Sequence, residues 1–185
     1  MELVRPTLEH VPSYIEARER GFSFDMNTAP EAIAALTAEI KADPVAFVRT
    51  VEDLDPVGRT VTLPDGSQVP RLPQYARWMW DGEFSGVITF RWQPGTVELP
   101  PHVLGHIGYA VVEWKRRRGY ATQALHDILE LPRLVGLPYV EITTNPDNIA
   151  SQGVVLANGG EFVRQYDRPA SQGGMPINLY RIALS

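Results

Sequence analysis

Apolar and polar residues repeat along the chain with two periods, one near 3.6 residues and one of two residues, which predict helices and strands. Helical spacing predicts a first helix over residues 8–20, with Thr7 as a candidate N-cap. Its regular part is expected from Pro12, which lacks an N–H donor. A second helix is predicted over residues 30–42, beginning at Pro30 and followed by Pro44.

Alternating residues predict strands on either side of these helices. A short strand is expected over residues 3–6. Proline and glycine punctuate residues 53–73, where Asp65-Gly66 separates two strand-like pieces at 60–63 and 67–69, and this predicts an inserted hairpin or ordered loop. The remaining elements are strands at 76–80, 84–92, 106–112, 139–144, 162–166 and 177–182, and helices at 120–131 and from 148 or 149 to 158–160.

This order predicts one domain over residues 1–185 with a mixed α/β sheet, antiparallel at first and with a parallel pair across the helix at 120–131. Pro132 is expected to close that helix. Hydrophobic residues make up 44% and charged residues 21%, which is ordinary for a globular protein. No stretch approaches the ~20 apolar residues of a membrane span, and the N-terminal residues lack the apolar core of a signal peptide, so a cytoplasmic protein is expected.

Residue counts narrow the chemistry. The chain has no cysteine, which excludes disulfides, a cysteine nucleophile and thiolate zinc sites. Its four histidines are not spaced as metal ligands, so no metal is predicted. The net charge of -5 argues against general nucleic-acid binding.

The most distinctive segment reads V-V-E-W-K-R-R-R-G-Y-A-T over residues 111–122, where a strand end passes through a basic turn into a helix start. Gly119 permits close backbone approach, and small Ala121 keeps the first helical turn open. Exposed N–H groups at a helix N-terminus attract an anion. Lys115 and the three arginines that follow it add positive charge there, so the turn is suited to a pyrophosphate.

Other interpretations of this turn are weaker. It lacks the Gly-Lys-Ser/Thr ending of a Walker loop and the three glycines of a dinucleotide fingerprint. A nucleic-acid tract or a solvated basic turn without a ligand are the remaining alternatives. The basic run is short and belongs to an acidic chain, which disfavours nucleic acid.

Three segments at the right spacing resemble the GNAT superfamily of N-acetyltransferases. The spacing R-x-x-G-x-A at Arg116, Gly119 and Ala121 resembles its acetyl-CoA signature. Residues 106–112 resemble its fourth strand, and 148–151 with 158–162 resemble the opening and exit of the helix that follows its fifth strand. Residues 104–109 and 146–151 look more narrowly like a bacterial subgroup of predicted acetyltransferases with undefined substrates.

The resemblance implies a GNAT-like fold, α/β or by some schemes α+β. It would have a mixed, mostly antiparallel sheet of six to seven strands, a splayed central parallel pair and about four helices. It also implies acetyl-CoA as cosubstrate, with pantetheine on the backbone of Val111 and Val112 and on Asn148 and Ser151. Asn148 suits a helix cap equally well. The pyrophosphate would lie on Arg116, Arg117, Arg118, Gly119, Tyr120, Ala121 and Thr122.

The catalytic positions depart from the family pattern. Where many relatives carry a glutamate base on the fourth strand, this chain has His106, either a base or a histidine hydrogen-bonded for structure. The usual tyrosine acid, seven residues after the asparagine, is replaced by Val155. Candidate substitutes for this acid are Tyr109, Tyr120 and Tyr166, or water.

The expected activity is acetyl transfer from acetyl-CoA to a primary amine of an unknown acceptor, by a monomer or homodimer. A non-catalytic acyl-CoA-binding module is the alternative, because His106 and Val155 are unusual. The acceptor side is expected between the first two helices, the fourth strand and the final hairpin. Its candidate wall residues are Phe24, Trp78, Trp80, Glu83, Glu141 and Tyr166. Aromatic residues are more often part of a core, and Glu141 suits a solvated carboxylate at a sheet edge equally well.

Overall fold

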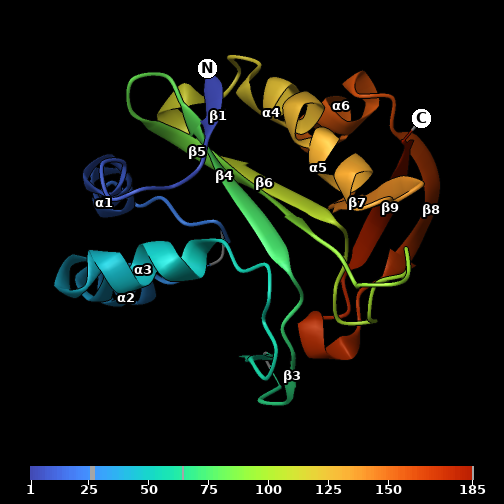
Figure 1. Cartoon of the computed structure of the whole chain (residues 1–185). Coiled ribbons are helices and arrows are strands. Elements are labelled where there is room, and N and C mark those ends of the chain that lie inside the picture. Colours follow the sequence, from blue (N-terminus) through green and yellow to red (C-terminus); the bar gives the residue numbers. More distant parts are fainter. Residues whose placement is uncertain (26–27, 64, 185) are drawn as a thin grey trace.

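The computed structural model describes residues 1–25, 28–63 and 65–184. Two sheets lie side by side and helices cover their faces (Figure 1). The first sheet has the strand order β1-β4-β5-β6 and the second has the order β7-β9-β8. All strand pairs inside the two sheets are antiparallel.

The strands of the first sheet follow the predicted alternation. Its members are β1 (Glu2–Val4), β4 (Gln74–Trp80), β5 (Phe84–Arg91) and β6 (Ile107–Val111). Ile88 and Phe90 of β5 point to one face and Val87 to the other, so two apolar clusters form on opposite sides. The sheet is therefore buried on both faces.

The second sheet closes the chain. It contains β7 (Tyr139–Thr144), β8 (Glu161–Asp167) and β9 (Pro176–Ala183), with the 3-10 helix η2 (Ala170–Gln172) between the last two. Strand β7 matches the predicted bounds. No ladder of main-chain hydrogen bonds joins β6 to β7 in the described part of the chain, so the sheet divides where a splayed pair was expected. The parallel orientation of that pair stays a prediction.

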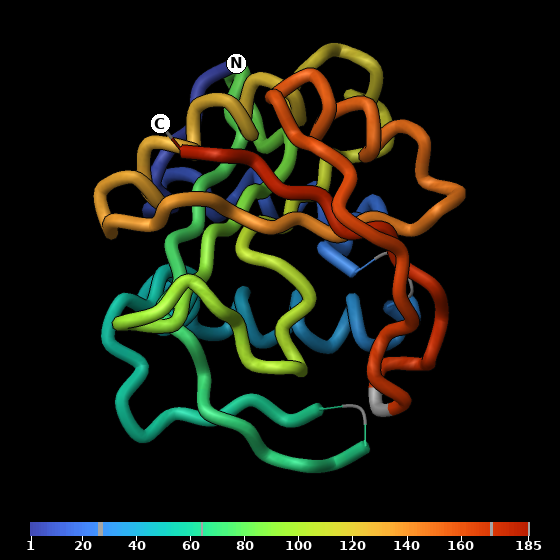
Figure 2. The backbone as a smooth tube through the Cα atoms, turned by 90° about the vertical axis from the view of Figure 1, so that its right-hand side faces the viewer, coloured from blue at the N-terminus to red at the C-terminus, as the bar shows by residue number. Residues whose placement is uncertain are grey.

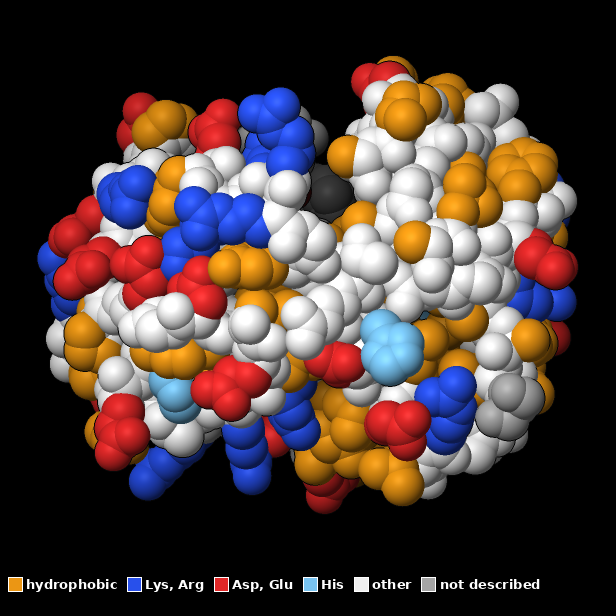
Figure 3. All heavy atoms as spheres, turned by 90° about the horizontal axis from the view of Figure 1, so that it is seen from above, with side chains coloured by type: hydrophobic (Ala, Val, Ile, Leu, Met, Phe, Trp, Pro, Cys, Tyr) orange, Lys and Arg blue, Asp and Glu red, His pale blue; other side chains and the backbone are white. Residues whose placement is uncertain are grey.

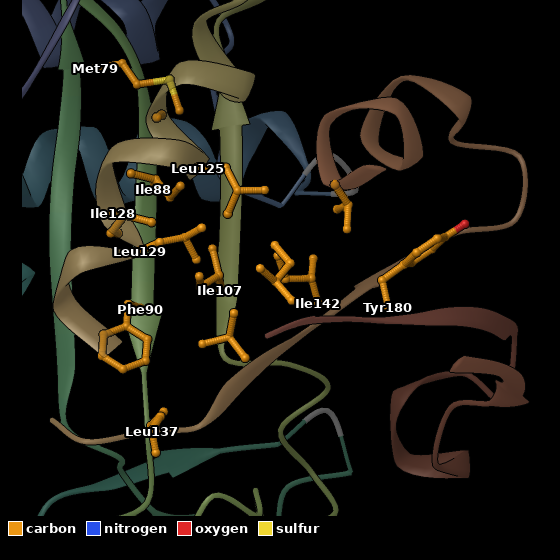
Figure 4. Packing of buried hydrophobic residues seen from close by; sticks show 14 residues of the cluster. Met79, Ile88, Phe90, Ile107, Leu125, Ile128, Leu129, Leu137, Ile142 and Tyr180 are labelled. Carbon is orange, nitrogen blue, oxygen red and sulfur yellow. The ribbon is translucent and has the colours of Figure 1, made fainter. Parts of the chain in front are cut away.

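Helices cover both faces of the first sheet. On one face lie α1 (Val11–Glu19), α2 (Pro30–Ala42) and α3 (Pro44–Val51), and on the other lies α4 (Tyr120–Ile128), followed by α5 (Glu130–Leu134) (Figure 1). Helix α6 (Ile149–Ala157) lies beside α4 and packs on β7 of the second sheet. Leu125 and Ile128 of α4 pack against Ile88 and Phe90 of β5 in the larger core (Figure 4). Burial of each such side chain stabilises the fold by roughly 1.5–3 kcal/mol.

Three helix predictions need correction. Helix α1 starts at Val11 with His10 at the N-cap, and Thr7 instead hydrogen-bonds the His10 ring one turn earlier. Pro44 does not simply follow α2, because it begins α3, whose N-cap Asp43 accepts from the N–H of Ala46 at 2.9 Å.

The predicted helix over residues 120–131 is two helices. Pro132 lies inside α5 and does not end a helix. It occupies the first turn, where an N–H has no partner within the helix, so proline is tolerated there. With α3 and α5, the described residues contain two short helices beyond the four expected.

The segment after α3 forms a hairpin that projects from the body. Strands β2 (Thr60–Thr62) and β3 (Gln68–Pro70) pair across the turn (Figure 2). Asp53 and Gln74 close its base with two main-chain hydrogen bonds of 3.0 and 2.7 Å. Buried Asp53 also pairs with Arg59 and Arg71, so the hairpin is anchored by charge as well.

Candidate active site

The two sheets contact each other where the chain enters β6. The N–H of His106 donates to the carbonyl of Glu141 in β7 at 2.7 Å, and the carbonyl of His106 accepts from the N–H of Arg91 in β5 at 2.8 Å. Gly105 comes just before, and a Cβ there would lie only 3.0 Å from the Glu141 carbonyl oxygen, so the two strands approach each other closely at this position. Beyond this point β6 and β7 separate, which leaves main-chain groups of β6 without a neighbouring strand.

The His106 ring holds the same junction. Its Nδ1 accepts from the N–H of Glu141 at 3.0 Å, and its Nε2 donates to the carbonyl of Val97 at 3.1 Å. The residue is 1% exposed, and burial lowers the pKa of its imidazole. Both nitrogens serve the main chain and no lone pair faces a substrate, so the geometry favours the structural alternative for His106 over a general base.

Strand β6 presents alternate residues to the opening. The N–H of Val112 donates to Ser85 in β5 at 3.0 Å, and its carbonyl accepts from Lys115 at 3.0 Å. Val112 is also fully buried, so both of its main-chain groups already serve the fold. Main-chain groups of successive strand residues point in opposite directions. Those of Val111 and Tyr109 therefore face the open side of β6.

Two side chains cross this opening near α6. The phenol of Tyr109 lies 2.8 Å from the hydroxyl of Ser151 and donates to the Ser151 carbonyl at 3.2 Å. Asn148 caps α6, because its Oδ1 accepts from the N–H of Ser151 at 3.0 Å. The family resemblance predicted Asn148 and Ser151 as neighbours in the site, and the structure brings Tyr109 to Ser151.

The first basic residue of the turn is committed to the fold. Lys115 is 4% exposed and ends the 3-10 helix η1 (Glu113–Lys115). Its ammonium group pairs with Asp81 and Glu83 and donates to Ser85 at 3.0 Å. Burial opposes ionisation of Asp81, but hydrogen bonds from Lys115 and other neighbours hold its pKa well below the usual range. Lys115 therefore fixes the β4–β5 turn, which corrects its expected role beside a polyanion.

The next four residues form an open cradle. Arg116, Arg117, Arg118 and Gly119 are exposed. Arg117 and Gly119 have φ of 62° and 78°, in the left-handed region, so the backbone curls before α4 begins. No side chain caps α4 and no acidic residue lies in its first turn, so the N–H groups of its first turn point to solvent. A Cβ on Gly119 would meet nothing within 4 Å, so the space above it is free.

The surface reflects this arrangement. Seen from above, the molecule is hollowed between its two halves, and basic side chains gather along one rim of the hollow (Figure 3). Arg116 also reaches back, and its Nε donates to the carbonyl of Val111 at 3.4 Å. The cradle and the open side of β6 are therefore parts of one continuous site.

The remaining tyrosine candidates lie elsewhere. The phenol of Tyr120 donates to Asp81 at 2.6 Å, so it supports the Lys115 cluster. Tyr166 lines a separate cavity of about 370 Å³ beneath residues 99–104, together with Glu141. Val155 is fully buried, and Gly160 packs so closely on it that a Cβ would lie 2.4 Å from its Cγ1. Only Tyr109 of the three borders the opening.

Only Trp78 of the six candidate acceptor-wall residues is buried in the core, and several of the others already have partners. Trp78 is 2% exposed and stacks on Tyr14, and Glu83 pairs with Lys115. The carboxylate of Glu141 accepts a hydrogen bond from the Arg181 guanidinium, with 2.7 Å between Oε1 and Nη2. Phe24 is 43% exposed, and its ring lies over Gly108 of β6. Among the described residues, no group of three or more histidines or carboxylates could hold a metal ion, and no helix is long and apolar enough to cross a membrane.

Comparison with known proteins identifies the family. A family model described as an acetyltransferase (GNAT) domain matches residues 3–161. This is most of the chain, and the protein belongs to the GNAT acetyltransferase family. The resemblance seen in the sequence is therefore confirmed. No curated protein matches the sequence.

Solved structures agree on the fold. The microcin C7 self-immunity acetyltransferase MccE, solved with acetyl-CoA and AMP, is 13% identical, with 98% of this chain and 91% of that chain covered and a TM-score of 0.61. A Salmonella typhimurium acetyltransferase that modifies the N-terminal serine of a 50S ribosomal protein is 16% identical, with coverage of 99% and 94% and a TM-score of 0.60. Mycobacterium smegmatis RimJ, with CoA-disulfide, is 17% identical, with coverage of 98% and 80% and a TM-score of 0.57.

Proposed function

We propose that this protein transfers an acetyl group from acetyl-CoA to a primary amine. The observation that carries the proposal is the junction of an exposed arginine cradle, an uncapped helix N-terminus and the unpaired side of β6. MccE and RimJ, which share the fold, were solved with acetyl-CoA and CoA-disulfide. Bound acetyl-CoA supplies an acetyl thioester that is reactive toward a neutral amine.

The cradle fits a pyrophosphate. The main-chain N–H groups of Gly119, Tyr120, Ala121 and Thr122 would hold its oxygens, with charge from Arg116, Arg117 and Arg118. The main-chain groups of Val111 would bind pantetheine, once Arg116 releases the Val111 carbonyl. Asn148 and Ser151 border that path, and the Asn148 amide nitrogen is the group left for a ligand while Oδ1 caps α6. Val112 is left out, because its own main-chain groups are engaged.

We assign assistance of the leaving thiolate to Tyr109, because its phenol borders the opening. Burial raises the pKa of its phenol to about 12, against about 8.5 for an ordinary thiol. Tyr109 would therefore turn its single O–H from the Ser151 carbonyl to the sulfur, donate a hydrogen bond there and keep its proton, and water would protonate the thiolate. His106 holds β6 in place beside the reacting groups, and the amine loses its proton to solvent.

Thermal unfolding with acetyl-CoA tests the cofactor part of the proposal. A ligand that binds only the folded state raises the melting temperature, so acetyl-CoA should stabilise the wild type. Gly119→Glu should abolish the shift, because it forces a carboxylate and a left-handed residue into the cradle. Gly58→Glu is the matched control, since Gly58 has a similar φ of 75° in an exposed turn. Absence of any shift in the wild type would overturn the proposal.

A non-catalytic acyl-CoA-binding module is the second candidate, favoured by the engaged nitrogens of His106 and by Val155 in the core. It predicts the same thermal shift but no thiol release with any primary amine. Thiol release measured over an amine panel separates the two candidates.

A further inference from the structure

Arg91, at the end of β5, is a guanidinium group without a partner carboxylate. No ion pair involves Arg91 among the described residues. Its Nε is buried and makes no hydrogen bond, and its Nη2 donates only to the Thr89 hydroxyl, at 3.3 Å. A buried charge without a counterion is costly, and proteins normally pair it.

The surroundings of Arg91 add positive charge. Burial lowers the pKa of Arg91, and the nearby Arg71 cation lowers it further. Arg71 and Arg59 share one carboxylate, Asp53, at 3.2 and 2.9 Å. Among the described residues, these three arginines therefore have one ion-pair partner, Asp53.

Arg91 lies on the face of the sheet opposite the cradle. Ile88 and Phe90 of β5 pack toward α4, so Thr89 and Arg91 point to the other face, like Val87, which packs against α1 and α2 residues. The cradle at the start of α4 leaves the α4 side to the cofactor. A second substrate must then reach the opening from the face that carries Arg91.

The guanidinium also lies close to the proposed reaction centre. A Cβ on Gly108 would lie 3.8 Å from Arg91 Nη2, 3.7 Å from the Thr89 hydroxyl and 3.1 Å from the Phe24 ring. Gly108 directly precedes Tyr109, whose main chain faces the opening. An anion bound to Arg91 would therefore lie beside Gly108, one position along β6 from Tyr109, the residue that we assign to the thioester.

We propose that Arg91 binds an anionic group of the acceptor, a carboxylate or a phosphate ester, and so orients its amine toward the thioester. The inference rests on the proposed acetyl transfer and names the substrate class. Guanidinium forks pair with both oxyanions through two parallel hydrogen bonds, and partly exposed Arg91 has no carboxylate partner among the described residues that would occupy its fork. The acceptor is thus an amine that carries an oxyanion a few bonds away.

Matched acceptors test this assignment. Alkylamines are compared with ω-amino carboxylates and ω-amino phosphonates of equal chain length, with thiol release as the readout. Wild type should favour one anionic series by about 10- to 100-fold in kcat/KM, the range for a charge-assisted hydrogen bond. In Arg91→Met that preference should disappear, whereas exposed Arg49→Met, the control, should keep both the preference and the alkylamine rate of wild type. Equal kcat/KM for the alkylamines and the anionic amines would overturn the assignment of Arg91. A preference for anionic amines that survives in Arg91→Met would also overturn it.

Binding provides a readout independent of turnover. On the CoA-saturated protein, the anionic compounds should raise the melting temperature of wild type and not of Arg91→Met. Without ligand, Arg91→Met should melt no lower than wild type, because it removes an unpaired charge. A lower melting temperature would make Arg91 structural and overturn the proposal. Failure of acetyl-CoA to bind is a separate result, which would overturn the proposed function.

Discussion

The phenolic oxygen of Tyr109 lies 2.8 Å from the hydroxyl oxygen of Ser151, and this hydrogen bond joins β6 to the first turn of α6. It spans the opening where the two sheets part. A thioester that enters there meets a tyrosine that is already held in place by Ser151. The hydrogen bond thus positions the phenol before any ligand arrives.

Removal of the Tyr109 hydroxyl should slow chemistry and spare cofactor binding. Tyr109→Phe is expected to lower kcat by about tenfold or more, because a hydrogen bond to the leaving sulfur is lost, while the Kd for acetyl-CoA changes little. Single-turnover thiol release and isothermal calorimetry separate the two effects. Tyr139→Phe, at the start of β7, is the control. An unchanged kcat for Tyr109→Phe would remove the residue from the reaction.

Loss of the His106 ring should weaken the fold more than the chemistry. His106→Ala removes two hydrogen bonds and leaves a buried void, so the free energy of unfolding should fall by roughly 2–4 kcal/mol. Denaturant titration measures this, with exposed His126→Ala as the control. A catalytic base would instead show a variant of normal stability with a collapsed rate at every pH.

Stability should also depend on pH through His106. Burial holds the pKa of the folded imidazole below its ordinary value of 6.5, so the unfolded chain binds more protons in the window below pH 6.5. The free energy of unfolding is therefore expected to fall as pH drops below 6.5 toward the folded pKa. His106→Gln should flatten that part of the curve, as judged by unfolding at several pH values. An identical slope in both proteins would show that the imidazole does not titrate in this way.

Lys115 should behave as a structural cation. Lys115→Ala leaves Asp81 without its buried partner and is expected to cost about 3 kcal/mol of unfolding free energy. Lys41→Ala, which breaks an exposed pair with Glu19, should cost less than about 1 kcal/mol. Thermal and chemical unfolding compare the two. If both variants lost the same unfolding free energy, burial of the Lys115 ion pairs would make no extra contribution to stability.

The three exposed arginines should govern the salt dependence of cofactor binding. Replacement of Arg116, Arg117 and Arg118 by alanine is expected to weaken acetyl-CoA binding by about tenfold or more at low salt. The same change should flatten the dependence of Kd on salt concentration, because screened charge pairs are lost. Arg133→Ala, on α5, is the control. If acetyl-CoA binding by the triple variant stayed as salt-sensitive as in wild type, the three arginines would not contact the cofactor phosphates.

Local patterns predicted most of the elements and the cradle. The strand at 139–144 has the expected bounds, and Asp65-Gly66 predicted the turn between β2 and β3. Gly119 was predicted to permit close backbone approach, and the structure gives it a φ of 78° at the start of α4. These features depend on neighbours in sequence, which is why the sequence alone indicated them.

Long-range partners explain what the sequence could not indicate. The four consecutive basic residues look alike in the sequence, yet Lys115 turns inward because it pairs with Asp81 and Glu83. These partners lie 34 and 32 positions earlier in the chain, so the local sequence does not indicate the pairing. His106 likewise meets Glu141 only once the sheets have formed. Arg91 has no motif around it, and its unpaired state is visible only in three dimensions. The start of α3 is different, because Asp43 followed by Pro44 is an N-cap signal that was available.

The closed base of the β2–β3 hairpin has a consequence for engineering. Because Asp53 and Gln74 are hydrogen-bonded neighbours, the chain leaves and rejoins the sheet at almost the same place. Residues 54–73 can therefore be exchanged for a shorter connection, a reporter or a binding peptide without stretching β4. The exchange must also replace Asp53 with a neutral residue, since Arg59 and Arg71 leave with the segment and would strand its buried carboxylate.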